Sequence, residues 1–466
     1  MNTKNDVKES IAINEMTPGQ IVAALDKYVI GHSQAKRAVS IALRNRYRRM
    51  KLSQELQKEV MPKNIILIGP TGVGKTEIAR RLATLSRAPF IKVEATKYTE
   101  VGYVGRDVES MIRDLVKVAM NMIRQEKMVE LHDKVEENVE ERILDILLPP
   151  PSKRKPLPAE DSESFDKTRA HFKKKLQEKK LEDRVIEVEM RTSQMPSVQV
   201  VASPGIEDLD MYMQDMLSGM IPKASSRKKT KISSARGILF NEELQKLIDM
   251  EEISREAIER VENHGVVFID EIDKIVGGGG HGPDVSREGV QRDILPIVEG
   301  ATVNTRFGIV NTQHILFIAA GAFHHVKPSD LIPELQGRFP VKVELDKLTE
   351  EDFARILTEP EHALIKQYKA LLMTDGVEIE VEQGAISAIA SIAVEVNKKA
   401  EDIGARRLHT VLEKLFEDIA FSAPDNITES KVIINKDTVM KKLKIEEIIK
   451  GENMRKKTVP GFGTRI

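Results

Sequence analysis

The 466-residue chain contains no cysteine, which excludes disulfide frameworks, thiolate metal sites and a cysteine nucleophile. It also lacks long apolar runs. The first ten residues, MNTKNDVKES, have no apolar stretch behind their charges, and no segment approaches the roughly 20 apolar residues of a membrane span. We therefore expect a cytoplasmic protein with no membrane partner. The formal net charge is only -1, so no global positive field favours nucleic acid as a partner.

The length and composition predict a folded protein of more than one domain. A chain of 466 residues is too long for a single compact core, so we expect two or three domains. Apolar runs at residues 64–68 and 90–93 are each followed by a helical pattern of apolar side chains. This alternation of strand and helix predicts an α/β fold with a parallel sheet and helices on both of its faces.

The pattern changes twice further along the chain. Residues 121–234 carry charge runs such as HFKKKLQEKK and a Met-rich stretch, MYMQDMLSGM, with little strand-like alternation. We interpret them as an inserted, mostly helical domain. Buried-looking strands resume at residues 266–269 and 314–319. The predicted large domain therefore comprises residues 1–120 and 235–345, and residues 346–466 form a small, α-rich C-terminal domain.

The segment GPTGVGKT at residues 69–76 matches the phosphate-loop pattern G-x-x-x-x-G-K-T between a predicted strand and a predicted helix. Its glycines let backbone N–H groups point at phosphate oxygens, and the following helix N-terminus adds partial positive charge. Lys75 supplies a fixed charge, and the Thr76 hydroxyl is a ligand for Mg²⁺. The alternative is an incidental glycine-rich turn, which the flanking elements disfavour. The predicted ATP-binding residues here are Gly69, Gly72, Val73, Gly74, Lys75, Thr76 and Glu77.

An acidic pair ends the apolar strand in GVVFIDEID. Asp270 is predicted to hold Mg²⁺, together with Thr76, and Glu271 is predicted to take the proton of the attacking water. An Asp-Glu pair alone is usually a solvated strand end. Because the C-terminal ends of parallel strands meet at one edge of a sheet, this pair is expected beside the phosphate loop.

Further motifs resemble the AAA+ unfoldases of the Clp/Hsp100 class: GYVG at residues 102–105, LIPELQGRFP at 331–340 and GAR at 404–406. Longer segments, such as DKYVIGHSQAKRAVSIALRNRYRR and DVSREGVQRDILPIVEG, resemble the HslU (ClpY) family. This resemblance implies a homohexameric ring that binds ATP between subunits. The ring would unfold tagged or unfolded protein substrates and thread them into HslV, a double-ring dodecameric peptidase.

The same resemblance assigns roles to single residues. Tyr103 and Val104 correspond to a pore loop that grips the substrate chain, and Arg338 to an arginine finger that reaches a neighbour's γ-phosphate. Arg406 corresponds to a sensor arginine that contacts the subunit's own nucleotide. Two further nucleotide contacts are implied, by Ile30 on adenine and by Glu334 at the interface. Taken alone, each of these residues has an ordinary alternative as a surface turn, an exposed ion pair or a core side chain.

Two features depart from the family. The segment FIAAGAF has Ala319 and Ala320 where many AAA+ motors carry a polar sensor residue, so no such role is assigned. The chain ends in MRKKTVPGFGTRI rather than in a short apolar tail that docks into HslV. A docking role for Ile466 and a disordered end are the two alternatives.

Other functions fit the sequence less well. A ClpX-like unfoldase that serves another peptidase would carry a four-cysteine zinc module, which a chain without cysteine cannot form. A DNA-remodelling AAA+ motor would need a basic face instead of balanced charge. A nucleotide-dependent scaffold without turnover is disfavoured because Lys75, Glu271 and Arg338 occur together.

Overall fold

The computed structural model describes residues 16–99, 106–149, 159–191, 225–277, 287–423 and 431–445. The chain forms two compact units, Met1–Val118 with Ile258–Ile466 and Ala119–Ala257. The finer division of the sequence into three domains remains a prediction. In the described part of the chain, no helix is both long and apolar enough to cross a membrane.

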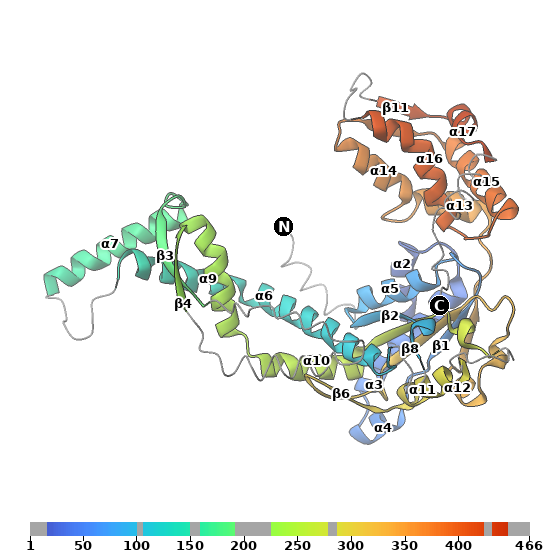
Figure 1. Ribbon diagram of the computed structural model, residues 1–466, viewed down its shortest axis with the longest axis horizontal. Coiled ribbons are helices and arrows are strands. Elements are labelled where there is room, and N and C mark those ends of the chain that lie inside the picture. Colours follow the sequence, from blue (N-terminus) through green and yellow to red (C-terminus); the bar gives the residue numbers. More distant parts are fainter. Residues whose placement is uncertain are drawn as a thin grey trace, which may run out of the picture. The chain divides into compact units, whose positions relative to one another are not determined.

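The first unit is built on a five-stranded sheet in the order β2-β5-β8-β1-β9, in which every neighbouring pair is parallel (Figure 1). The predicted α/β fold with a parallel sheet is therefore confirmed. β5 and β8 lie in the interior of the sheet, and all but one of their residues are buried, which accounts for their continuous apolar runs. The strands are β1 (Ile65–Ile68), β2 (Phe90–Glu94), β5 (Val266–Asp270), β8 (Leu316–Gly321) and β9 (Val341–Glu344).

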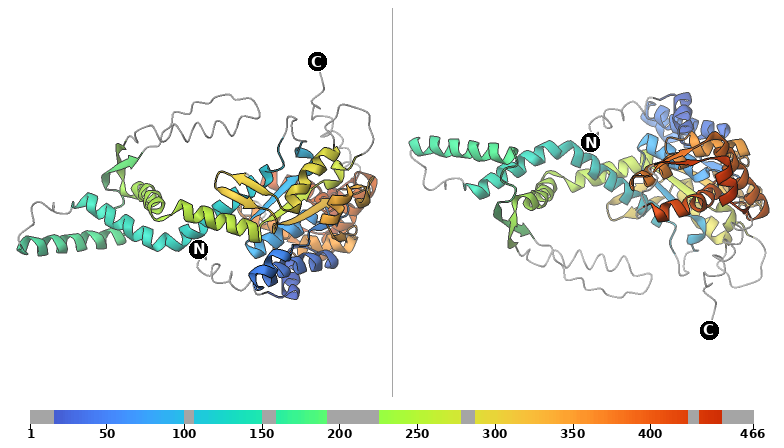
Figure 2. Two further views of the ribbon diagram at one scale, coloured as in Figure 1. Left: turned by 90° about the horizontal axis from the view of Figure 1, so that it is seen from below. Right: turned by 90° about the horizontal axis from the view of Figure 1, so that it is seen from above.

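One face of this sheet packs against α2 (Pro18–Asp26), α3 (Ser33–Met50) and α5 (Lys75–Ser86), through a core that includes Leu25, Val39 and Ile78 (Figure 2). α2 begins at a capping box in which Thr17 and Gln20 exchange side-chain and backbone hydrogen bonds. The local sequence T-P-G-Q at residues 17–20 has the form of a capping box with proline at the first helical position, so this helix start depends on neighbouring residues alone. The remaining elements of the large part of the unit are α4 (Gln54–Glu59), η1 (Ala95–Lys97), η2 (Ile272–Ile275), α11 (Arg287–Glu299), β6 (Thr302–Thr305), β7 (Gly308–Asn311), η3 (Pro328–Asp330) and α12 (Pro333–Arg338).

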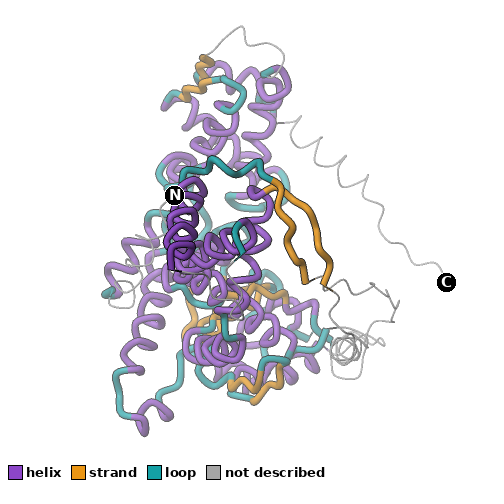
Figure 3. The backbone as a smooth tube through the Cα atoms, turned by 90° about the vertical axis from the view of Figure 1, so that its left-hand side faces the viewer, coloured by secondary structure: helices purple, strands orange, loops and turns teal. Residues whose placement is uncertain are grey.

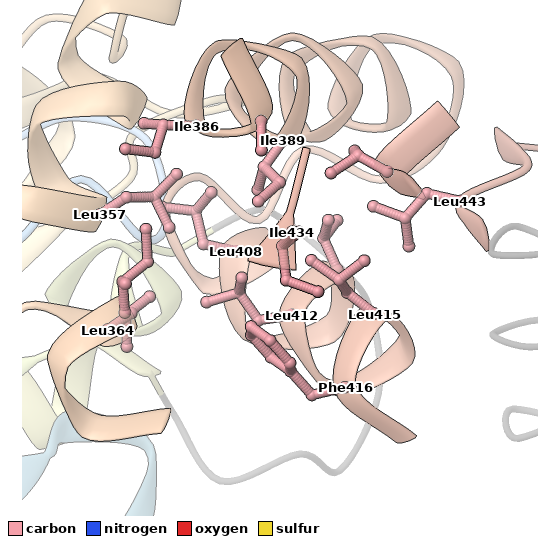
Figure 4. Close-up of a cluster of buried hydrophobic side chains, with 14 of the residues drawn as sticks. Leu357, Leu364, Ile386, Ile389, Leu408, Leu412, Leu415, Phe416, Ile434 and Leu443 are labelled. Atoms are coloured by element: carbon pink, nitrogen blue, oxygen red, sulfur yellow. The ribbon is translucent and has the colours of Figure 1, made fainter. Parts of the chain in front are cut away.

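The C-terminal part of the first unit is mainly helical and has its own apolar core (Figure 4). Leu408, Leu412, Leu415 and Phe416 recur at helical spacing on α16 and are fully buried or nearly so. A short parallel pair, β10 (Glu378–Val381) with β11 (Lys431–Ile434), completes this core. The helices are α13 (Glu350–Thr358), α14 (Leu364–Met373), α15 (Gln383–Lys399), α16 (Arg406–Ser422) and α17 (Lys436–Lys442).

The second unit contains an antiparallel pair of strands that the sequence interpretation missed. β3 (Val185–Arg191) and β4 (Ser225–Lys231) pair in antiparallel fashion and appear as the long orange strands of Figure 3. Ile186 and Val188 are buried in the core of this unit. The partner strand reads SSRKKTK, so it shows no apolar alternation that could predict it. The helices are the later part of α6 (Ser110–Leu147), α7 (Ala159–Gln177), α9 (Ile232–Leu247) and most of α10 (Met250–His264).

Candidate active site

The phosphate loop connects the end of β1 to the start of α5. The Gly69 N–H donates to the Gly321 carbonyl at 3.2 Å, which ties the loop to the end of β8. Gly72 and Gly74 have φ angles of +77° and +104°, values that residues with a Cβ rarely adopt. The loop therefore curls tightly and presents the N-terminus of the 12-residue helix α5 to an anion.

Lys75 lies at the floor of this loop. Its ammonium donates to the carbonyl oxygens of Gly69 at 2.5 Å and Pro70 at 2.8 Å, and the side chain is buried. Burial lowers the pKa of Lys75. The negative charges of Asp270 and Asp273 oppose this shift, whereas the positive charge of Arg406 adds to it. A buried cation of this kind is stabilised by an anionic ligand, as a nucleotide phosphate would be.

The acidic pair ends β5 beside α5, as the sequence predicts. The Thr76 hydroxyl lies 3.4 Å from Asp270 Oδ2. The same oxygen forms an ion pair with Lys92 Nζ at 2.7 Å. Thr76 and Asp270 together offer a hydroxyl and a carboxylate at the mouth of the phosphate loop. This donor set fits Mg²⁺, which prefers oxygen ligands and takes few of them from protein in nucleotide sites.

Glu271 has a left-handed backbone conformation, with φ at +55°. For a residue with a side chain, this conformation costs on the order of 1 kcal/mol or more. Its N–H donates to Asp270 Oδ1 at 3.0 Å, so the two acidic residues turn sharply at the strand end. Both side chains line the cleft beside Lys75 and Thr76. The strain is thus located at the residue predicted to be the base.

These groups line a single cleft of about 810 Å³, a volume typical of ligand sites. Tyr28 and Ile30 line the cleft from the loop between α2 and α3, whereas Ile403, Arg406 and His409 come from the C-terminal part of the same unit. Gly69 lies at the base of the loop. The predicted residues that line the cleft are Ile30, Gly72, Val73, Gly74, Lys75, Thr76, Glu77, Asp270, Glu271 and Arg406.

Two predicted residues lie elsewhere in the first unit. Glu334 and Arg338 are both exposed on the short helix α12, and neither is among the described residues that line the cleft. The Arg338 guanidinium pairs with Glu299 Oε1 at 2.8 Å, and the Arg338 carbonyl accepts from the side chain of Asn64 at 3.1 Å. The predicted pore-loop residues, Tyr103 and Val104, lie outside the described residues.

The structure adds contacts that the motifs did not predict. One is the ion pair between Lys92 and Asp270. Another is a hydrogen bond between His32 Nε2 and the Val73 carbonyl oxygen, at 2.8 Å. Burial lowers the pKa of His32, so this ring is neutral at pH 7 and donates to the carbonyl. The Arg81 guanidinium lies 4.2 Å from the centre of the Tyr28 ring. Strand register could have identified Lys92, because it lies two residues before Glu94, the partner of Asp270, and therefore on the same face of β2. The other contacts depend on tertiary packing.

The geometry agrees with comparisons to known proteins. The AAA family model, described as an ATPase family associated with various cellular activities, matches residues 65–149, and a model of the AAA domain (Cdc48 subfamily) matches residues 188–342. The ATP-dependent protease ATPase subunit HslU of Persephonella marina is 54% identical over 441 residues, which cover 94% of this chain and 98% of that protein.

Two other relatives show the same extent of similarity. HslU of Thermotoga maritima is 53% identical over 461 residues, 95% of this chain and 98% of its own length. The ATP-dependent protease ATPase subunit ClpY of Bacillus subtilis is 53% identical over 449 residues, 92% of this chain and 96% of that protein. The resemblance inferred from the motifs is confirmed: the chain is a nucleotide-binding AAA+ ATPase and belongs to the HslU (ClpY) family of ATPase subunits of ATP-dependent proteases.

Proposed function

We propose that this chain forms a hexameric ring that uses ATP hydrolysis to unfold proteins and thread them into an HslV-type peptidase. One observation carries the proposal. The cleft of a single chain combines the phosphate loop, Asp270, Glu271 and Arg406, while Arg338 is exposed on α12 and outside it. A chain that places its arginine finger away from its own nucleotide site needs a neighbour to complete that site.

The hydrolytic step uses residues of this chain in separate roles. Backbone N–H groups of the phosphate loop and Lys75 bind the triphosphate, and Thr76 with Asp270 would hold Mg²⁺. When bound, this ion would supply positive charge that stabilises the reacting phosphate group. Glu271 orients the attacking water and accepts its proton. Arg338 of the adjacent subunit stabilises the charge that develops in the transition state.

The conversion of hydrolysis into pulling involves residues of two kinds. Arg406 comes from the C-terminal part of the unit and lines the same cleft as the phosphate loop. Hydrolysis of the bound nucleotide would therefore change the contacts on both sides of the cleft. Tyr103 and Val104 would grip the substrate. The family resemblance supports this role, since an aromatic ring between glycines offers contact area on a movable loop.

The partners are also inferred from the family. Relatives that are 53–54% identical are named as ATPase subunits of an ATP-dependent protease, which supports a peptidase partner of the HslV type. A cytoplasmic location is proposed from the sequence alone. The test is a phosphate-release assay with and without a permanently unfolded protein, followed by a peptidase assay with purified HslV. We expect the unfolded protein to raise the rate of phosphate release, and this chain to raise the peptidase activity of HslV. An ATPase rate that ignores polypeptide, or responds to DNA instead, would overturn the proposal.

The grip has its own test within this experiment. Tyr103→Ala is expected to retain ATP hydrolysis and to lose unfolding of a folded reporter protein. The matched control is Phe421→Ala, which removes another aromatic ring, 85% exposed on α16. Equal unfolding by Tyr103→Ala and the control would remove the grip from the proposed mechanism.

A further inference from the structure

The phosphate loop touches the backbone of the C-terminal part of the unit. The Gly72 carbonyl accepts a hydrogen bond from the N–H of Ala405 at 3.0 Å. A Cβ added to Gly72 would lie 1.9 Å from the Ile403 carbonyl oxygen, and one added to Gly404 would lie 2.6 Å from the Thr71 oxygen. Both glycines also have positive φ angles, +77° and +59°. Two glycines therefore face each other where no side chain fits.

The phosphate pattern does not require glycine at position 72. In G-x-x-x-x-G-K-T, the required positions correspond here to Gly69, Gly74, Lys75 and Thr76, and Gly72 occupies one of the variable places. Its left-handed backbone and its close contact with Ile403 are separate reasons for a glycine. The contact with Ile403 means that the C-terminal part of the unit, and not phosphate binding alone, requires a glycine at position 72.

The opposing loop, residues 401–405, is held rigidly from its other side. Arg407 is 1% exposed, and its guanidinium donates to Asn397 Oδ1 at 3.0 Å and to the Glu401 carbonyl at 2.8 Å. The Asn397 amide in turn donates to the Gly404 carbonyl at 3.1 Å, and Asp402 accepts from the Gly404 N–H, also at 3.1 Å. A buried network of this kind fixes the loop to α15 and α16. A clash at Gly404 therefore cannot be relieved by a local shift of the loop.

We infer that residues 401–405 are a backbone latch, which docks the C-terminal helices onto the phosphate loop and so positions Arg406 at the nucleotide. α16 begins at Arg406, directly after the latch. His409 follows one turn later on the same face, and both line the cleft. A displacement of the latch would withdraw both side chains together. The inference rests on the proposed function only in that the cleft binds ATP or ADP.

The first test compares two glycine replacements in the full-length chain. Gly404→Ala introduces both a strained φ and a clash, whereas the control Gly376→Ala introduces a strained φ, +81°, into open space. We expect Gly404→Ala to bind a fluorescent ADP analogue at least about tenfold more weakly than the parent, which corresponds to about 1.4 kcal/mol. The control should remain within about twofold, with a similar thermal midpoint. Equal affinities of the two variants would overturn the latch.

A second variant covers the case in which Gly404→Ala does not fold. Ala405→Pro removes the N–H that donates to Gly72, at a φ of -62° that proline adopts and directly before α16, where proline is tolerated. It should show the same loss of ADP affinity. If Ala405→Pro keeps the affinity of the parent, the latch is wrong.

Combination with Arg406→Ala distinguishes positioning from a general structural effect. If the latch places Arg406, Arg406→Ala weakens binding in the parent and has little further effect in Ala405→Pro, because the guanidinium is already withdrawn. Full additivity, or no effect of Arg406→Ala alone, would overturn the positioning role. Binding of ADP by the parent is a separate readout: its absence would contradict the proposed function, whereas unchanged variants would contradict only the latch.

Discussion

Glu271 and Lys92 show how the active site depends on single residues. Glu271 occupies a left-handed conformation at the strand end, and Lys92 pairs with the neighbouring Asp270 at 2.7 Å. The ion pair occupies the oxygen that also lies 3.4 Å from Thr76. A carboxylate that is held by a lysine in this way is oriented before a metal reaches it, at the cost of competition for the same oxygen.

Replacement of Glu271 tests the assignment of the base. Glu271→Gln keeps the size of the side chain and its place in the cleft but removes proton acceptance. We expect turnover to fall by at least about 100-fold, the range of general-base effects, with ATP binding retained. Steady-state phosphate release and nucleotide titration provide the two measurements. Glu359→Gln, at an exposed ion pair at the C-cap of α13, serves as the control, and turnover of Glu271→Gln at the control rate would rule out the base.

Two partly buried histidines, His264 and His314, predict a pH dependence of stability. Burial, with Arg46 and Arg49 nearby, lowers the pKa of His264 and of His314 to about 4. In the unfolded chain a histidine has a pKa near 6.5. The folded protein thus takes up fewer protons than the unfolded chain, so this contribution is complete above about pH 6.5 and is lost as the pH falls toward 4.

Replacement of His264 isolates this effect from the carboxylates. Between pH 7 and pH 5, one such histidine lowers the free energy of unfolding by about 2 kcal/mol at most. His264→Asn should therefore lose less stability than the parent over this interval, by up to that amount. Equilibrium urea unfolding at the two pH values is the measurement. Parallel pH profiles of parent and variant would contradict the assignment.

Among the elements, α12 is fixed to the sheet by one side chain from the residue before β1. Asn64 is buried, donates to the Arg338 carbonyl at 3.1 Å and accepts from the Phe317 N–H at 3.0 Å. It therefore connects α12 to β8. Arg338, the predicted finger residue, is exposed, but its backbone is positioned from the interior of the sheet.

Asn64→Ala is expected to affect both stability and catalysis. It leaves buried backbone groups without partners, which costs about 1–3 kcal/mol, and it releases the end of α12. We expect a lower kcat for ATP hydrolysis with unchanged nucleotide affinity, because Asn64 is not among the described cleft residues. Asn241→Ala, at an exposed position on α9, is the control. A loss of affinity with an unchanged kcat would contradict this role.

At the scale of the whole molecule, the site is proposed to be complete only in an assembly. The Arg338 guanidinium is paired with Glu299 in the isolated chain, and such an exposed pair contributes little to stability. An arginine held so weakly is free to exchange Glu299 for a phosphate on a neighbouring subunit. Function would therefore depend on contacts between copies of this chain.

Mixed subunits test action between copies. Arg338→Ala and Glu271→Gln are each expected to be inactive alone, since one lacks the finger and the other lacks the base. In a mixture, an interface that joins an intact Arg338 to an intact Glu271 should recover part of the ATPase activity. The phosphate-release rate is measured across mixing ratios. Inactivity at every ratio, with mixed assembly verified by size, would exclude a finger that acts between subunits.

The features predicted from sequence are those that depend on residues close together in the chain. The capping box at Thr17 and the phosphate loop are local, because their hydrogen bonds and backbone angles involve neighbouring residues. The antiparallel pair β3–β4 was missed because the polar strand β4 has no apolar periodicity and pairs across a long separation in the chain. Lys92 was missed for a similar reason, since its partner Asp270 lies on another strand.

The parallel α/β core, the phosphate loop, the acidic strand end and the family's motifs could all be predicted from the amino-acid order, because each is encoded in residues that lie close together in the chain. Three other features follow from the folding of the chain: Gly72 contacts Gly404, Lys92 pairs with Asp270, and Arg338 is not among the described residues that line the cleft. These contacts join residues far apart in the chain. Burial, distance and direction between such residues are set by packing, which no local pattern encodes.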